Sequence, residues 1–157
     1  MAKAKPEQTP RIRNKKARRR FEVFEKIDCG MALQGTEVKS LRVGQASLDE
    51  AYALIKNGEA FMVGCHIAPY DHGNVMNHEP TRTRKLLLRR REITRLSSKV
   101  AQKGLTLIPL SIYFNDRGLA KVTLGLARTK VQGDKRQDMR KREHQREMER
   151  ARGRGGR

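Results

Sequence analysis

The chain has 157 residues, and its 36 Lys and Arg outnumber its 17 Asp and Glu, which gives a formal net charge of +19 at pH 7. A chain of this length usually folds as one domain of roughly 100–150 residues, so a large two-domain enzyme is not expected. The longest apolar run, residues 105–114, is interrupted by polar residues and is far shorter than the roughly 20 residues that span a bilayer. We therefore expect no membrane segment. The basic N-terminus also lacks the apolar core of a secretory signal, which predicts a cytoplasmic location.

The positive charge is concentrated at the two ends. Residues 1–20 carry nine basic side chains and one acidic one, residues 128–157 carry twelve and five, and residues 21–127 carry fifteen and eleven. All seven aromatic residues lie within residues 21–127. We therefore predict a basic N-terminal arm (1–20), a compact domain (21–127) and a basic tail (128–157). Such arms bury almost nothing and are expected to be disordered when free.

Alternating apolar residues predict short strands near residues 21–27, 31–34, 51–55 and 60–63. Asn57-Gly58 separates the last two, and this pair favours a tight hairpin turn. Residues 108–114 and 122–126 form a second predicted hairpin, with its turn at 115–118. A short helix is expected to begin at Thr36 as its cap and to end at Gly44.

A longer helix is predicted from Arg84 to Lys103, with Gly104 as its C-cap. The predicted fold is mainly β with helices: a small antiparallel OB-like β-barrel of about six strands with two or three helices. A flat antiparallel sheet with helices on one side is the alternative.

Three consecutive leucines at the start of the long helix divide between two directions. Helical spacing places Leu86 on an apolar stripe with residues 93, 96 and 100, whereas Leu87 and Leu88 point away from it, among six Arg and Lys. This pattern predicts an apolar wedge within an anion-binding patch. The alternative is that the helix starts at Arg89 and residues 86–88 form an extended core segment.

Residues 134–152 of the tail are almost wholly polar. Opposite charges at helical spacing, such as Glu143 and Arg146, support a helix only weakly, and no apolar face is available to bury. We predict that this segment becomes helical against a phosphate-lined surface. The alternative is a solvated tail with no partner.

The charge predicts a polyanionic partner, and nucleic acid is favoured over anionic lipid because no segment joins a basic face to a broad apolar one. No phosphate-binding loop or catalytic triad is evident, so no enzymatic activity and no cofactor are expected. The nearest set of metal-binding types is Cys65-His66 with His72, His78 and distant Cys29, but it lacks the paired spacing of zinc sites. Both cysteines are expected to be reduced.

Several longer motifs resemble the small protein B (SmpB) family over about residues 14–150. The motifs are NKKAR (14–18), LQGTEVKSLR (33–42), NGEAF (57–61), RTRKLLL (82–88), KGLTLIPL (103–110) and DKR (134–136). The resemblance implies an OB-type barrel that binds the tRNA-like part of transfer-messenger RNA (tmRNA). The complex, with elongation factor Tu, enters a stalled ribosome, where the tail occupies the empty mRNA channel beside the small-subunit decoding centre. It also implies a monomeric adaptor for ribosome rescue and nascent-chain tagging.

The resemblance also implies roles for individual residues. Asn14 would contact RNA, Asp28 would order the RNA-binding face, and Leu87 would press on the RNA elbow. The implied RNA-binding set is Asn14, Lys15, Lys16, Arg18, Asp28, Glu37, Lys39, Arg82, Arg84, Lys85, Leu87 and Arg89. The implied ribosome-contacting set is Arg128, Lys130, Lys135, Arg136, Arg140, Lys141 and Arg142. The family commonly has an aromatic residue or His where this chain has Gly133. Two rival functions are a structural ribosomal protein and a metal-dependent enzyme that uses the histidines.

Overall fold

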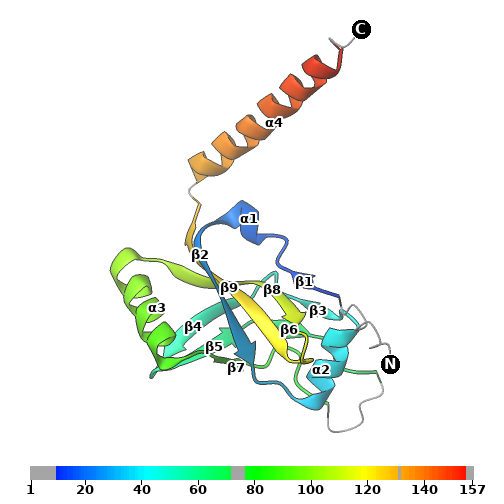
Figure 1. Ribbon diagram of the computed structural model, residues 1–157, viewed down its shortest axis with the longest axis vertical. Helices are drawn as coiled ribbons and strands as arrows, with labels where there is room; N and C mark the ends of the chain where they lie inside the picture. Colours follow the sequence, from blue (N-terminus) through cyan, green and yellow to red (C-terminus); the bar gives the residue numbers. More distant parts are fainter. Residues whose placement is uncertain (1–9, 72–76, 131, 155–157) are drawn as a thin grey trace.

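The computed structural model describes residues 10–71, 77–130 and 132–154 (Figure 1). Its strands are β1 (Ile12–Arg13), β2 (Phe21–Met31), β3 (Ala46–Ser47), β4 (Tyr52–Lys56), β5 (Glu59–Val63), β6 (His66–Ile67), β7 (Arg84–Leu87), β8 (Thr106–Phe114) and β9 (Ala120–Thr129). Its helices are α1 (Ala17–Arg20), α2 (Gly35–Arg42), α3 (Arg90–Lys103) and α4 (Gln132–Arg154).

Six strands form a ring of antiparallel pairs in the order β8-β4-β5-β7-β2-β9, and β9 returns to pair with β8. Strand β1 adds to the other edge of β8, and β3 pairs with β6 in a separate small sheet. The prediction of a mainly β fold with about six antiparallel strands is confirmed. The flat-sheet alternative is wrong because the two ends of the sheet pair with each other.

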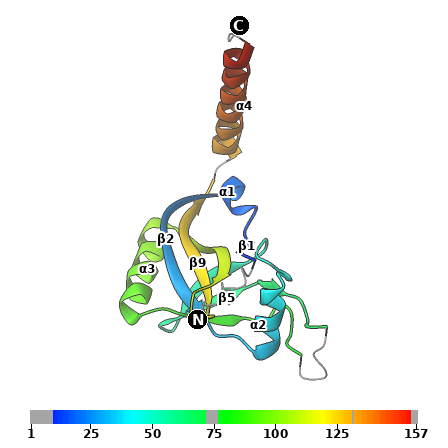
Figure 2. The ribbon, with the colours of Figure 1, turned by 45° about the vertical axis from the view of Figure 1, so that its right-hand side comes forward.

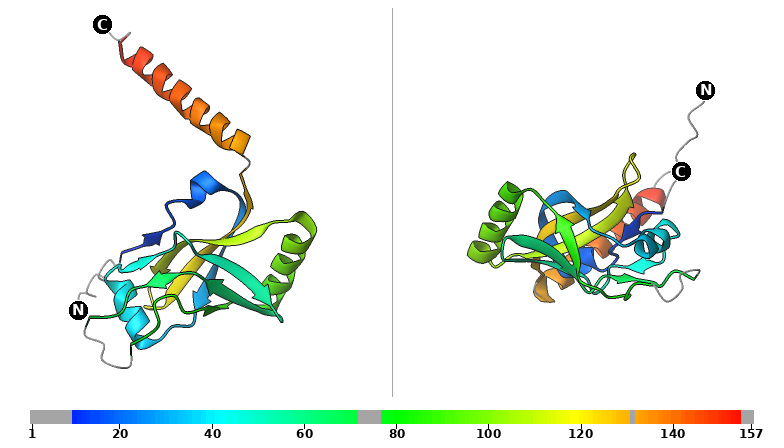
Figure 3. Two further views of the ribbon diagram at one scale, coloured as in Figure 1. Left: turned by 180° about the vertical axis from the view of Figure 1, so that it is seen from behind. Right: turned by 90° about the horizontal axis from the view of Figure 1, so that it is seen from below.

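The core lies inside this ring and is closed at its two sides by helices. Inward residues of β9, such as Leu124, have no exposed surface. Helix α3 places a fully buried Leu96 into the core, and α2, on the opposite side of the ring, places Leu41 there (Figures 2 and 3). Glu25 of β2 holds α3 in place through ion pairs with Arg95 and with Lys99, whose Nζ lies 2.8 Å from the carboxylate.

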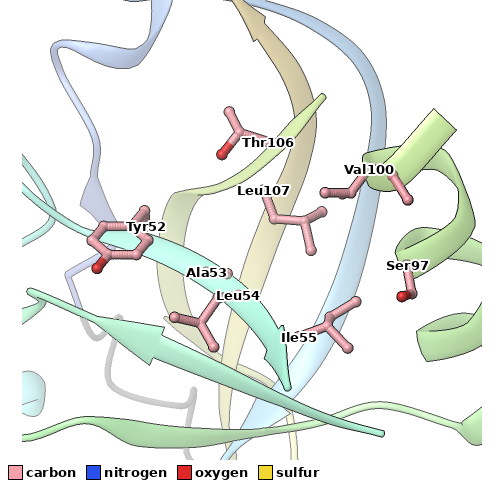
Figure 4. Close-up of a pocket in the computed structure, with 9 residues that line it drawn as sticks. Tyr52, Ala53, Leu54, Ile55, Ser97, Val100, Thr106 and Leu107 are labelled. Carbon is pink, nitrogen blue, oxygen red and sulfur yellow. The ribbon is translucent and has the colours of Figure 1, made fainter. Parts of the chain in front are cut away.

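The ring is thinnest between β4 and β8, which share only the pair Ala53 and Leu107. Beyond that pair the two strands diverge and leave a groove of about 380 Å³ lined by β4, β8 and α3. Leu107 of β8 and Val100 of α3 both point into this gap (Figure 4). Helix packing therefore completes the wall where backbone hydrogen bonds do not.

Both predicted hairpins are confirmed. Asn57 and Gly58 have φ values of 53° and 73°, as a type I′ turn between β4 and β5 requires. The β8–β9 turn has Gly118 at a φ of 76°, and the Asn115 side chain accepts the backbone N–H of Leu119 at 2.9 Å.

The predicted helix from Arg84 to Lys103 is wrong in its first turns. Residues Arg84–Leu87 form β7 between β5 and β2, and α3 begins only at Arg90. The alternative is therefore confirmed in its later helix start, but residues 86–88 are not a core segment throughout, because Leu87 is 54% exposed and Leu88 is only half-buried. Leu86 is buried because strand alternation points it inward, while Leu87 points outward.

Helix α2 has its N-cap at Gln34, two residues before the predicted cap Thr36. The Glu37 side chain accepts the backbone N–H of Gln34 at 2.8 Å, which satisfies a donor at the helix start. No separate strand forms at residues 31–34, because Met31 is the last residue of the long strand β2.

The N-terminal arm differs from the expectation that it buries almost nothing, whereas the described side chains of the tail are nearly all exposed. Ile12 pairs with Ile112 and is buried, as is Ala17 in α1. The backbone N–H of Lys130 donates to the carbonyl of Arg20 at 2.7 Å, so the end of β9 is tied to α1. Beyond it, α4 extends away from the ring (Figure 1). In the described part of the chain, no helix is both long and apolar enough to cross a membrane.

Two glycines with similar backbones give a test of close packing in this fold. Gly58 and Gly64 have φ values of 73° and 75°, but only at Gly64 would an added Cβ meet a backbone atom, the Glu50 carbonyl oxygen at 2.6 Å. We expect Gly58→Ala to cost about 1–2 kcal/mol in the free energy of unfolding, from the left-handed conformation alone. Gly64→Ala should cost clearly more, as measured by urea denaturation. Equal costs would contradict the close approach.

Candidate nucleic-acid interface

The strand register brings side chains from four strands into one row on the outer surface. Gly30 of β2 lies opposite both Leu87 of β7 and Lys121 of β9, and Lys121 lies opposite Tyr113 of β8. Directly opposed residues share one face of a sheet. Lys26 and Asp28 of β2 and Lys85 of β7 lie at alternate positions of their strands and share this face. We call the surface the Leu87 face, and its side chains are Lys26, Asp28, Lys85, Leu87, Tyr113 and Lys121.

Leu87 is the large apolar side chain of this face, and 54% of its surface is exposed. It lies directly over Gly30: a Cβ added to that glycine would be 3.2 Å from the Leu87 Cβ. The exposed wedge expected at this residue is therefore present, although a strand presents it rather than a helix.

Asp28 connects the middle strands of the face. Its carboxylate accepts the Thr123 hydroxyl of β9 at 2.7 Å. Burial raises the pKa of Tyr113 on β8, and the charge and hydrogen bond of Asp28 raise it further. The Arg11 guanidinium stacks on the Tyr113 ring at 4.6 Å from its centroid. Asp28 therefore links β2 to β9, and its role in ordering an RNA-binding face stays a prediction.

The lysines of the Leu87 face are available to an anionic ligand. Lys85 pairs with Glu59 at 3.2 Å, but both side chains are about half exposed. Such exposed pairs are worth only a few tenths of a kcal/mol to about 1 kcal/mol, so Lys85 can exchange its partner for a phosphate at little cost. Arg89, exposed between β7 and α3, extends the positive edge.

Two N–H donors of Asn14 bind strand β8 of the ring. Its backbone N–H donates to the Leu110 carbonyl at 2.8 Å and its Nδ2 donates to the Pro109 carbonyl at 2.9 Å. It therefore fixes the basic arm to β8. Lys15 and Arg18 are exposed on that arm, and Lys16 pairs with Glu50 at 3.4 Å.

Glu37 and Arg84 do not fit the RNA contact that the resemblance implied, because both side chains are fully buried. Glu37 forms ion pairs with Arg84 and with the partly exposed Arg82. Arg84 also donates to the carbonyls of Cys65 at 2.7 Å, Arg82 at 3.0 Å and Pro80 at 3.1 Å. These three residues form a charged hub that joins α2 to β7 and the segment before it.

Lys39 lies on the exposed side of α2, and its Nζ lies over the Tyr70 ring, 5.3 Å from the ring centroid. It is therefore displaced from the residues of the Leu87 face, which lie on β2, β7, β8 and β9.

Among the described residues, the histidine and cysteine side chains are not arranged as a metal site. Buried His78 contacts the Thr36 hydroxyl through Nδ1 and the Ile67 carbonyl through Nε2, both at 2.8 Å. Burial raises the pKa of Cys29 to about 12 and that of Cys65 to about 11, which keeps both as thiols. Within the described ranges, no three His, Cys, Asp or Glu side chains come together as a site for a metal. His72 lies outside the described residues.

The tail cations fall into two groups. Arg128 of β9 pairs with Glu22 of β2 at 2.9 Å. Lys130 donates to the Arg18 carbonyl at 3.0 Å and contacts Asp138 of α4 at 2.6 Å, so it connects α1 to the base of α4. Four members of the implied ribosome-contacting set project from α4 and are exposed: Arg136, Arg140, Lys141 and Arg142. Lys135 lies in the first turns of the same helix.

Sequence reasoning missed Gly30, Tyr113 and Lys121 as parts of this surface. The signal for Lys121 was its alternation with the inward residues Val122 and Leu124. Its position beside Leu87, however, depends on which strand pairs with β2 and in which register. That information is not contained in any single strand.

The family model described as SmpB protein matches residues 11–154 of the chain. The SsrA-binding protein of Symbiobacterium thermophilum is 52% identical over 151 residues, which cover 96% of each chain. The SsrA-binding protein of Salinispora arenicola is 55% identical over 141 residues, which cover 90% of this chain and 88% of the relative.

A solved structure described as "tmRNA-SmpB: a journey to the center of the bacterial ribosome" contains a chain similar to this one. The two chains superpose with a TM-score of 0.67 at 50% identity, and the match covers 78% of this chain and 86% of the other.

The charged hub predicts a specific acid dependence of stability. Burial acts to raise the pKa of Glu37, but the hydrogen bonds from Gln34, Arg82 and Arg84 outweigh it, so the folded pKa lies below the ordinary value of 4.5. The resulting stabilisation is complete above the unfolded pKa and is lost as pH falls through the folded pKa. Glu37→Gln should therefore flatten the acid limb of the stability curve. At neutral pH it should lower the free energy of unfolding by about 3–5 kcal/mol, because Arg84 loses its charge partner.

Urea denaturation between pH 7 and pH 3 measures both effects. Glu59→Gln, at an exposed pair, is the matched control and should change stability by less than about 1 kcal/mol. An unchanged acid limb in Glu37→Gln would show that the hub does not titrate as described.

Proposed function

The chain belongs to the SmpB protein family, and on that basis we propose that it is a non-catalytic adaptor that binds the tRNA-like domain of tmRNA. In this role it delivers the RNA to ribosomes stalled on messages that lack a stop codon. Relatives about 50% identical over most of the chain carry the name SsrA-binding protein, and the similar solved structure concerns tmRNA and SmpB on the ribosome.

The observation that carries the RNA-binding part is the exposed Leu87 on a positively charged sheet face. Lysines displace counterions from phosphates and supply affinity that is nearly independent of RNA shape. An apolar side chain fixed on a strand can contact RNA only where the RNA exposes a base or ribose surface of matching shape. The combination favours a folded RNA over an arbitrary one.

We further propose a division of labour along the chain. Residues 21–127, together with the arm before them, bind the tRNA-like RNA, and residues 128–157 contact the ribosome. The described side chains of α4 include many exposed cations and form no apolar face, which suits a polyanionic channel better than a protein groove. The tail would occupy the empty mRNA channel beside the small-subunit decoding centre, with the adaptor entering as a monomer together with elongation factor Tu and alanyl-tmRNA.

Recovery and sequencing of RNA bound to the purified protein tests the proposal as a whole. We expect strong enrichment of one RNA with a tRNA-shaped end. A heterogeneous mixture without such a species would contradict it, and stoichiometric retention on salt-washed ribosomes would favour a structural ribosomal protein.

The first variant test concerns the Leu87 face. Leu87→Asp replaces the apolar contact by an anion close to the phosphates expected beside the lysines, and Leu87 is exposed, so the fold should survive with its far-ultraviolet circular dichroism unchanged. We expect the affinity for the tRNA-like domain to fall by at least about 100-fold, since a lost apolar contact and a repulsive charge act together. Leu119→Asp, at a similarly exposed leucine in the β8–β9 turn, is the control and should bind normally.

The second test separates the two partners. A chain that ends after Lys130 keeps every strand of the ring, so we expect its RNA affinity to change by less than about threefold. Tagging of nascent chains on stalled ribosomes in a reconstituted translation system should disappear. Loss of binding to the isolated RNA would show that the tail belongs to the RNA-binding site.

A further inference from the structure

A small groove lies directly beside Leu87, at the edge of the Leu87 face. It has a volume of about 300 Å³ and lies between the β4–β5 turn, β7 and the start of α3. Its lining side chains include Glu59, Lys85, Leu87, Leu88, Arg90 and Ile93. The turn of the Asn57–Phe61 motif, together with Glu59, forms one wall of this groove.

The lining combines an apolar floor with a charged rim. Leu88 and Ile93 are half-buried, and Leu87 stands exposed at one side. The rim carries Lys85 and Arg90, and their exposed neighbours Arg89 and Arg91 add further positive charge. A ligand that complements this site therefore combines an apolar body with a negative charge beside it.

A single unstacked nucleotide meets these requirements. Its base has two apolar faces for Leu87, Leu88 and Ile93, and its phosphate would lie near Lys85 and Arg90. Proteins commonly read RNA in this way, by splaying a base out of a loop and binding its edge. Charge complementarity thus favours a nucleotide over an apolar peptide or a lipid chain.

Glu59 supplies a means of selecting the base. An ionised carboxylate only accepts hydrogen bonds, and its two oxygens match two adjacent N–H donors. Guanine presents such a pair, N1–H and N2–H, on its Watson–Crick edge. The exposed pair between Glu59 and Lys85 at 3.2 Å can open at little cost, which would free the carboxylate for the base and the ammonium for the phosphate.

We propose that this groove receives one unstacked guanine of the bound RNA, with Glu59 as its specificity-determining residue. The proposal rests on the RNA-binding function proposed above and names the nucleotide that the same surface would select.

Filling the groove tests whether a base enters it. Ile93→Trp in the full chain should occupy the floor, and Ser98→Trp, on an exposed position of the same helix outside the groove, is the matched control. The probe is the transcribed tRNA-like domain of tmRNA. We expect about a tenfold loss of affinity for Ile93→Trp at fixed salt, the size typical of one stacked base, and none for Ser98→Trp.

Chemical footprinting with kethoxal, which modifies N1 and N2 of unpaired guanine, identifies the nucleotide. The wild-type protein and Ser98→Trp should protect one unpaired guanine that stays reactive with Ile93→Trp. Equal affinity and identical footprints for wild type and Ile93→Trp would overturn the proposal.

Exchange of the base tests the role of Glu59. RNA with adenine in place of the protected guanine should bind wild type about tenfold more weakly, because adenine N1 is an acceptor that faces the carboxylate. Glu59→Gln should restore binding of the adenine RNA and weaken that of the guanine RNA, since an amide both donates and accepts. The absence of this exchange would overturn the assignment of Glu59.

The outcomes also separate this proposal from the function on which it rests. If wild type does not bind the tRNA-like RNA, both are wrong. If wild type binds tightly while every groove variant binds equally well, only the groove assignment is wrong.

Discussion

The buried ion pair between Glu37 and Arg84 sets the position of the strand that carries Leu87. Arg84 is the first residue of β7, and its guanidinium is surrounded by the Glu37 carboxylate and three backbone carbonyls. Because side chains alternate along a strand, an inward Arg84 requires an inward Leu86 and an outward Lys85 and Leu87. A slip of one residue would bury a lysine and leave Arg84 without its partner, so the register is strongly specified.

This arrangement connects the stability of the fold to the chemistry of its surface. A buried ion pair is a weak source of net stability, since desolvation offsets much of its attraction, but its disruption is costly. The hub therefore acts mainly on geometry: it joins α2, the segment before β7 and β7 itself. Gly30 completes the arrangement from β2, because its missing side chain lets Leu87 lie close to the sheet.

Local signals in the sequence were sufficient for the hairpins but not for β7. The Asn57-Gly58 turn depends only on two residues that tolerate positive φ, so the sequence predicts it directly. Residues 84–88 are good helix formers, and Leu86 fits the helical spacing of Leu96 and Val100. The apolar pattern therefore predicted a helix that starts several residues too early. Pairing with β5 and β2 overrides that preference, and neither partner strand is adjacent in sequence.

The same reasoning explains why the candidate site was only partly predictable. The family motifs identify Glu37 and Arg84 as important, but their burial depends on contacts between residues 47 positions apart. Charge composition predicts a polyanionic partner, yet most of the excess charge lies in the arm and the tail, where it gives attraction without shape selectivity. Selectivity must come from the nearly neutral ring, where the hub holds one leucine and one small groove in fixed positions. A folded RNA that matches them gains contacts that charge alone does not provide.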